Sequence, residues 1–217
     1  MTLPNDSILV TPGAGATVAT HLVSSKEYQA VVVADADGHI QGSNPVYRLI
    51  VLGSAVGANQ VHCDLFNATG SGVRLKVLSA RVVPDTDTAI AGTVAAEVFL
   101  TRTTAVGTGG TAATLDSTSL TAPSISELDT DNPALNANIT ARSRPTGGAT
   151  AGAILGVRYI FTEETSAAAQ IAGTFGVEYV TPEAPIYVRE NQGLRFVQGA
   201  IATVGTLTFE ITFETVS

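Results

Sequence analysis

The sequence contains few of the side chains on which most enzymes depend. Its 217 residues include three histidines, one cysteine and no tryptophan, and only 14% are Asp, Glu, Lys or Arg, against about 25% in typical soluble proteins. Low charge leaves a surface with less protection against association, so we expect an obligate oligomer or an assembly subunit. No set of residues suggests a nucleophile with an activating base. We therefore expect no enzymatic activity and no cofactor.

Cys63 is the only cysteine, which excludes an intramolecular disulfide. Within the run 61–66, period-two alternation places Cys63 on the same face as Val61 and Leu65, and we interpret it as a buried small thiol, not a nucleophile. His62 and Asp64 share the other face. We interpret them as a partly exposed pair on a strand, because catalytic zinc would need a further ligand from elsewhere.

Two other kinds of motif have simpler interpretations than ligand binding. Gly13–Ala16 is glycine-rich but lacks the Gly-Lys-Ser/Thr and the following helix of a phosphate loop. Three Asp-x-Asp pairs lie in predicted loops, namely Asp35/Asp37, Asp85/Asp87 and Asp129/Asp131. None continues into an EF-hand pattern, so turn and capping roles are favoured over calcium binding. We expect no metal site.

The distribution of charge and hydrophobicity excludes two classes of partner. The net charge is -8, and the 11 basic residues are scattered, whereas nucleic-acid binding requires a basic patch. No apolar run approaches the roughly 18 residues of a membrane span, and the N-terminus has no basic signal region. We expect a soluble protein made in the cytoplasm that binds neither nucleic acid nor membrane.

The apolar residues that are present follow the period of β-strands. In the segment 206–214, Leu207, Phe209, Ile211 and Phe213 alternate with Thr or Glu, which predicts a strand with one buried face. Comparable segments are 60–66, 73–83, 94–102, 157–162, 175–180 and 194–198. Seven such strands separated by turns predict an all-β sandwich or barrel. Only 165–171 and 124–128 could form short helices.

Two strands depart from simple alternation. In 73–83 the apolar phase changes, which predicts a β-bulge near Val77 and favours a jelly-roll-like antiparallel β-sandwich. The segment 47–52 is apolar on both faces except at Arg48, which suits a strand covered by another layer or by a partner. Long Gly- and Thr-rich connections follow at 103–114 and 144–152, and loops of this length often contact a neighbouring subunit.

We expect the first 43 residues to form a separate N-terminal arm and β-hairpin, and residues 44–217 to form the sandwich domain. Strands are predicted at 16–23 and 27–34, and Asp37-Gly38 is a hairpin signal. A piece of this size is too small to hold its own core. It must dock on the main domain or on another subunit.

Several segments resemble parts of tailed-bacteriophage virion proteins. They are Ile-Leu-Val-Thr-Pro-Gly at 8–13, Ala-Thr-His-Leu-Val at 19–23, Tyr-Gln-Ala-Val-Val-Val-Ala-Asp at 28–35 with the following Asp37-Gly38 turn, Phe-Asn-Ala-Thr-Gly-Ser-Gly-Val-Arg-Leu at 66–75, Leu-Thr-Arg at 100–102 and Gly-Gly-Thr-Ala at 109–112. The resemblance implies a capsid decoration or cement protein on the virion's capsid surface, assembled in the host cytoplasm. It also implies a homotrimer that clamps neighbouring major capsid subunits.

The arm and the doubly apolar strand supply the candidate interface residues for such a protein. They are Leu3, Pro4, Ile8, Leu9 and Val10 in the arm, and Tyr47, Ile50 and Leu52 in the strand. Two alternatives remain open. The same composition suits a tail, collar or fibre subunit, and a β-sandwich could also bind carbohydrate, although the chain offers no Trp and only five Tyr for stacking on sugars.

Overall fold

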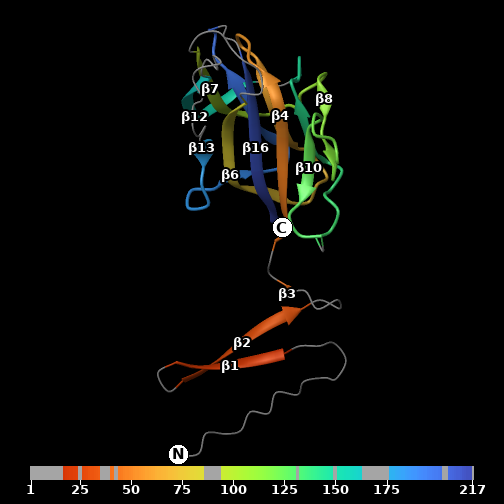
Figure 1. Cartoon of the computed structure of the whole chain (residues 1–217). Helices are drawn as coiled ribbons and strands as arrows, with labels where there is room; N and C mark the ends of the chain where they lie inside the picture. Colours follow the sequence, from red (N-terminus) through yellow and green to blue (C-terminus); the bar gives the residue numbers. More distant parts are fainter. Residues whose placement is uncertain are drawn as a thin grey trace, which may run out of the picture. The chain divides into compact units, whose positions relative to one another are not determined.

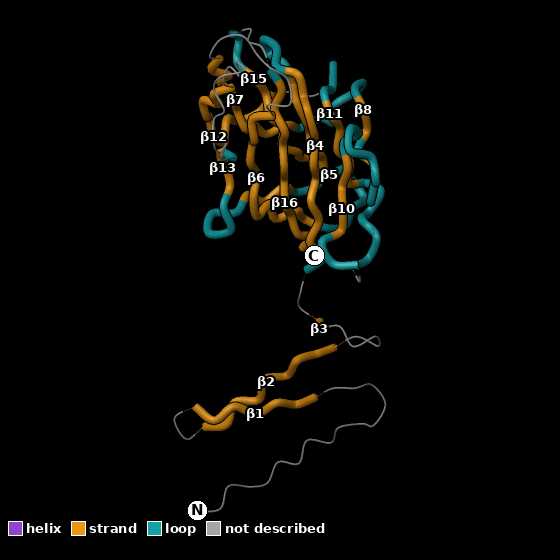
Figure 2. Tube along the Cα trace, viewed as in Figure 1, coloured by secondary structure: helices purple, strands orange, loops and turns teal. Residues whose placement is uncertain are grey.

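The chain divides into two compact units, Met1–Asn44 and Pro45–Ser217. The computed structural model (Figure 1) describes residues 17–23, 26–34, 40–41, 44–85, 94–130, 132–148, 151–162, 176–201 and 205–216. All regular structure in these ranges is strand, as the colouring of Figure 2 makes plain. Because the described residues form no helix, none of them belongs to a helix that could cross a membrane.

The N-terminal unit contains one three-stranded sheet. Strand β1 (Thr17–Val23) pairs antiparallel with β2 (Lys26–Ala34), and β2 pairs with the short β3 (Ile40–Gln41). The two longer strands agree with those predicted at 16–23 and 27–34. The Asp37-Gly38 turn lies outside the described residues, between β2 and β3.

The second unit is a β-sandwich of two sheets, and the all-β prediction is confirmed. The larger sheet has the order β13-β6-β16-β4-β10-β9, with β14 also pairing β6, and the smaller has the order β12-β7-β15-β5-β11-β8. The strands of the larger sheet are β4 (Val46–Ala55), β6 (Arg74–Asp85), β9 (Thr114–Leu115), β10 (Ser124–Glu127), β13 (Val177–Val180), β14 (Ile186–Val188) and β16 (Thr206–Val216). Those of the smaller sheet are β5 (Val61–Asn67), β7 (Val94–Thr103), β8 (Thr111–Ala112), β11 (Ile139–Ser143), β12 (Ala151–Thr162) and β15 (Gln192–Gln198).

The strand order is that of a jelly roll. Taken along the chain, the eight principal strands are β4, β5, β6, β7, β12, β13, β15 and β16. One sheet contains, side by side, β13, β6, β16 and β4, which are the sixth, third, eighth and first of these strands. The other sheet contains β12, β7, β15 and β5, which are the fifth, fourth, seventh and second. Every connection changes sheet except that from β7 to β12, which is the arrangement produced by two Greek keys.

The β7–β12 connection carries strands β8 to β11, which extend both sheets on one side. Strand β10 pairs with β4, and β11 pairs with β5. The sequence predicted a short helix at 124–128, and this is wrong. Residues 124–127 form strand β10 because Ile125 pairs with Leu49 and buries its side chain in the core, a tertiary contact that overrides local preference.

The core lies between the sheets and follows the predicted alternation of β16. Leu207, Phe209, Ile211 and Phe213 are all buried. The Phe213 ring stacks on that of Tyr47 with centroids 5.7 Å apart, and the Phe209 ring packs on that of Phe196 at 5.0 Å. The aromatic contacts therefore join neighbouring strands as well as the two sheets.

The predicted bulge in β6 is present at Leu78. Thr212 of β16 pairs with Ser79, and the next residue, Phe213, pairs with Val77, so Leu78 has no counterpart. The extra residue keeps Val77 and Ala80 both in the core despite their odd spacing. On its other edge, β6 pairs with β14 before the bulge and with β13 after it.

Candidate functional site

A second bulge determines the placement of His62. In the β5–β15 pairing, Phe196 lies opposite Cys63 and Val197 opposite Val61, so His62 is the extra residue. Its ring enters the space between the sheets and stacks on Phe209 at 4.7 Å between centroids. His62 is fully buried, and the prediction of a partly exposed pair with Asp64 is wrong.

Both ring nitrogens of His62 have partners. Nδ1 lies 2.9 Å from Ser54 Oγ, and Nε2 lies 3.3 Å from Gln198 Oε1. Gln198 Oε1 also accepts the Gly57 N–H at 2.8 Å, while the Gln198 amide nitrogen donates to the Ile201 carbonyl. Because Oε1 can only accept, we assign the proton to Nε2, and Nδ1 accepts from Ser54.

Burial lowers the pKa of His62 to about 4, because the charged ring would lose its hydration. The imidazole is therefore neutral at physiological pH and connects the end of β4, at Ser54, to the end of β15, at Gln198. Because the ring is fully buried and both of its nitrogens are hydrogen-bonded within the protein, it stabilises the fold and is not accessible to a substrate.

Cys63 is buried, as the sequence predicted. Burial is the main cause that raises the pKa of its thiol, and the neighbouring Asp64 carboxylate adds to the effect. A thiol that is buried and protonated is a poor nucleophile. The interpretation of Cys63 as a packing residue therefore agrees with its surroundings.

Asp64 lies on the opposite side of the sheet from His62, beneath the loop that follows β7. Its Oδ2 accepts the Gly107 N–H at 2.8 Å, and a Cβ at position 107 would collide with this carboxylate and with Pro145. Arg142 and Arg195 lie opposite Asp64 on the two flanking strands. Burial raises the pKa of Asp64, while the Gly107 hydrogen bond and the two guanidinium groups oppose that rise.

The two long connections predicted at 103–114 and 144–152 contact each other near this carboxylate. Thr108 N donates to the Gly147 carbonyl at 2.7 Å, and Thr146 N donates to the Thr108 carbonyl at 2.9 Å. Together with Gly107 they cover Asp64, so the carboxylate fastens a loop to the outside of the sheet. Its position gives it no open face towards solvent.

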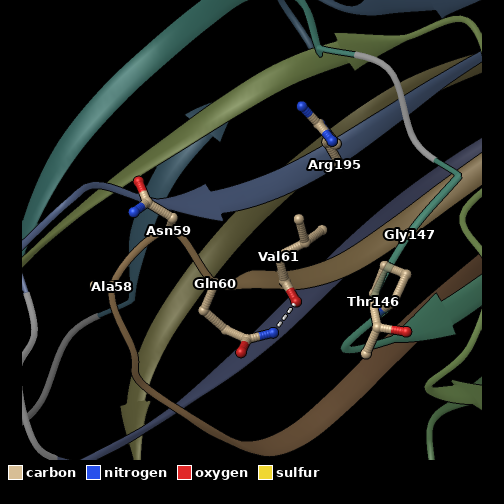
Figure 3. Close-up of a pocket in the computed structure, with 8 residues that line it drawn as sticks. Ala58, Asn59, Gln60, Val61, Thr146, Gly147 and Arg195 are labelled. Carbon is tan, nitrogen blue, oxygen red and sulfur yellow. Dashed lines mark hydrogen bonds between the residues drawn. The ribbon is translucent and has the colours of Figure 1, made fainter.

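Two hollows adjoin on the outer face of the smaller sheet, and Asn59 and Arg195 line both of them. One, of about 330 Å³, is drawn in Figure 3 and is lined otherwise by residues 58, 60–61 and 145–147. The other, of about 410 Å³, is bordered by Glu97, Phe99 and Ile154 among others. At their junction Arg195 Nε donates to Thr101 Oγ1 at 3.2 Å. We call this pair of hollows the Arg195 groove.

The Arg195 groove offers hydrogen-bonding groups and apolar contacts, so its chemistry suits non-covalent binding of a partner or ligand. Its carboxylate, Glu97, accepts a hydrogen bond from Tyr159 Oη at 3.0 Å. Among the described residues, no group of three His, Cys, Asp or Glu side chains could hold a metal ion. Of the three Asp-x-Asp pairs, at least one member of each lies outside the described residues.

Of the predicted interface residues, the structure describes Tyr47, Ile50 and Leu52, and these three do not share a face. Leu3, Pro4, Ile8, Leu9 and Val10 lie outside the described residues. Tyr47 is a core residue whose hydroxyl donates to the Pro133 carbonyl at 2.5 Å, so it presents no surface to a partner. Its strand alternates, and Ile50 and Leu52 are half-buried and exposed on the outer face of the larger sheet.

Strand β12 is a second strand with exposed apolar residues on it, and it is longer than the sequence pattern predicts. Strand β12 begins at Ala151, six residues before the predicted start at Val157, and exposes Ile154, Leu155, Val157 and Tyr159. The signal was present, since 153–157 is apolar at consecutive positions just as 49–52 is. The glycine- and threonine-rich composition of 144–152 predicts a loop, and it conceals the start of the strand.

Comparison with protein-family models, curated proteins and solved structures finds no match to this chain.

Proposed function

We propose that this chain is a structural subunit of a virion, a capsid decoration or cement protein that binds the major capsid protein lattice and copies of itself. The observation that carries the proposal is the division into a jelly roll and a small N-terminal unit. Jelly rolls are common in viral capsid proteins. The resemblance of the sequence to tailed-phage virion proteins supplies the specific class.

The N-terminal unit is the proposed attachment element. A sheet of two full strands and one two-residue strand is marginal as an independent structure in water. Docking on a neighbouring subunit would bury its apolar residues and stabilise a shell without chemistry. The apolar residues Leu3, Ile8 and Val10 of the preceding arm are proposed to contact the capsid.

Deleting residues 1–12 tests the attachment role. Mixed with undecorated capsids, the shortened protein should bind at lower occupancy, while its thermal unfolding temperature stays that of the full chain. Replacing Leu3, Ile8 and Val10 together by serine should have the same effect. Replacing the polar arm residues Thr2 and Ser7 by alanine is the matched control and should leave occupancy unchanged. Wild-type occupancy of the shortened protein would show that the arm does not mediate attachment.

The location in the virion separates this proposal from a tail, collar or fibre subunit. A head decoration protein is expected in hundreds of copies per particle, and a tail or collar subunit in a few to some dozens. Quantitative mass spectrometry of purified virions measures that copy number. The mass of the free protein in solution tests the homotrimer that the resemblance implies.

Carbohydrate binding is the second candidate, because jelly rolls also occur in lectins and the Arg195 groove provides amide and guanidinium groups. Among the described residues that line the groove, Phe99 is the only aromatic one, and sugar sites commonly rely on aromatic stacking. A glycan array should therefore be negative. Binding that is lost in Arg195→Ala would favour this second function instead.

A further inference from the structure

The sheet edges of the sandwich differ greatly in length. Three of the four edges end in short strands: β8 and β9 have two residues each, β13 has four and its companion β14 has three. Short edge strands are one means by which proteins prevent edge-to-edge pairing. Strand β12 forms the fourth edge, at the left in Figure 1, and has 12 residues.

Strand β12 also lacks most of the other forms of edge protection. Among the described residues it pairs with β7 alone. It contains no proline or lysine, and its only charged residue is Arg158. Register shifts disturb its first half, but from Gly156 to Thr162 it pairs with β7 without interruption. The regular half therefore presents an ordinary strand edge.

Except for Arg158, the exposed side chains described on β12 are apolar. Ile154 is 63% exposed and Tyr159 60%, and Leu155 and Val157 are each 37% exposed. Clusters of exposed apolar residues mark interaction surfaces. Arg158 is also exposed, and its guanidinium lies over the Tyr179 ring at 5.4 Å and donates from Nη1 to the Val157 carbonyl at 2.9 Å. Because Phe99, opposite Val157, directs its backbone groups to β15, this carbonyl points to the free edge, and pairing there replaces an exposed side-chain hydrogen bond with a backbone one.

We propose that β12 pairs antiparallel with β12 of a second copy of this chain, joining the two six-stranded sheets across a two-fold axis at Val157. This register places Gly156 opposite Arg158 and Leu155 opposite Tyr159. The only charge on the strand then faces a residue without a side chain, and the two arginines do not oppose each other. Apolar cross-strand pairs of this type stabilise antiparallel sheets.

The contact is isologous, so it closes at two copies. It does not depend on the proposed capsid function, and it differs from the homotrimer that the resemblance implies. A protein that is monomeric in solution yet still decorates capsids would overturn the pairing and leave the proposed function intact.

Sedimentation of the full chain over a range of concentrations tests the pairing. The expected result is a reversible equilibrium between one chain of 22.2 kDa and a species of twice that mass. Val157→Lys should weaken the dimer at least about tenfold, because it places two like charges at the axis. Val106→Lys is the matched control: Val106 is a valine 40% exposed in a loop, and its substitution should leave the equilibrium unchanged.

A cysteine crosslink tests the register, and also covers the case in which Val157→Lys fails to fold. Cys63 is buried, so Val157→Cys adds the one accessible thiol. At a two-fold axis this thiol meets its own copy within disulfide distance, and mild oxidation should produce a covalent dimer on a non-reducing gel. Val106→Cys should crosslink at least about tenfold more slowly.

Three outcomes would overturn the pairing. The first is a wild-type chain that remains monomeric, or forms a trimer, at every concentration. The second is a dimer that folded Val157→Lys and Val106→Lys weaken equally. The third is a Val157→Cys variant that crosslinks no faster than Val106→Cys.

Discussion

Acidification should destabilise the sandwich through His62. The folded chain holds this imidazole neutral, with a pKa of about 4, whereas the ordinary histidine pKa is 6.5. Between these two values the unfolded chain binds a proton that the folded chain does not. The free energy of unfolding must therefore fall as the pH falls through this window, and the contribution is fully recovered above about pH 6.5.

The magnitude follows from the difference in pKa. A difference of about 2.5 units corresponds to about 3 kcal/mol of lost stability between pH 7 and pH 4. This is a large fraction of the roughly 5–15 kcal/mol that holds a typical domain folded. Asp64 acts in the opposite direction, because its raised folded pKa favours the folded state as that carboxylate takes up a proton.

Replacing His62 with glutamine isolates the effect. His62→Gln removes the titrating group but keeps an amide that can bond to Ser54 or Gln198, and the contribution of Asp64 cancels when the two proteins are compared. Urea unfolding followed by circular dichroism at pH 7, 6, 5 and 4 supplies the free energies. The variant should be less stable than the wild type at pH 7, because it loses the stack on Phe209, and should lose about 3 kcal/mol less on going to pH 4.

Equal losses in the two proteins between pH 7 and pH 4 would refute this reasoning. An independent check is the titration of the imidazole proton signals in the nuclear magnetic resonance spectrum of the wild type. A His62 resonance that titrates near the ordinary value of 6.5 would contradict the buried, neutral ring.

Three further predictions concern the core and the loop over Asp64. Cys63 should not react with a thiol reagent in the folded chain, and one thiol per chain should react after unfolding in urea; prompt reaction of the native protein would contradict its burial. Phe209→Ala should reduce the free energy of unfolding by about 3–5 kcal/mol, whereas Leu52→Ala on the outer face should change it by less than about 1 kcal/mol. Gly107→Ala should destabilise the chain by more than about 1 kcal/mol through its collision with Asp64 and Pro145, and Gly107→Ser should be no better tolerated; wild-type stability in either variant would show that the loop can move away.

Local alternation was enough to predict most strands but not their partners. The alternation of Leu, Ile and Phe predicted strand β16, and the phase change in 73–83 predicted a bulge near Val77, one residue from its position at Leu78. These features are visible because one face of each strand is buried. The jelly-roll order depends on contacts between distant segments, for example β4 with β16, which no short window of sequence contains.

The errors have a common physical origin. His62 was predicted to be partly exposed because alternation was counted through a bulge, and the bulge exists only because of how β15 pairs with β5. Tyr47 was predicted at an interface because its strand is apolar at successive positions. Which face of that strand is buried depends on the second sheet of the sandwich, and the local sequence does not show it. The Arg195 groove combines residues from four separate segments, so no single sequence motif predicts it.

The edge strand and the Arg195 groove are connected through Ile154. This residue belongs to β12 and also lines the larger hollow, and Glu97 of the same hollow binds the Tyr159 hydroxyl on β12. Pairing of two copies through β12 would therefore place the two Arg195 grooves on the same face of one continuous sheet, one on each side of the two-fold axis. A partner that contacts both grooves would bind with higher overall affinity than one that contacts a single groove, because the second contact becomes intramolecular. Self-association would therefore strengthen binding to a repeated surface such as a protein lattice. Val157→Lys should then weaken capsid attachment as well as the dimer, whereas Val106→Lys should weaken neither.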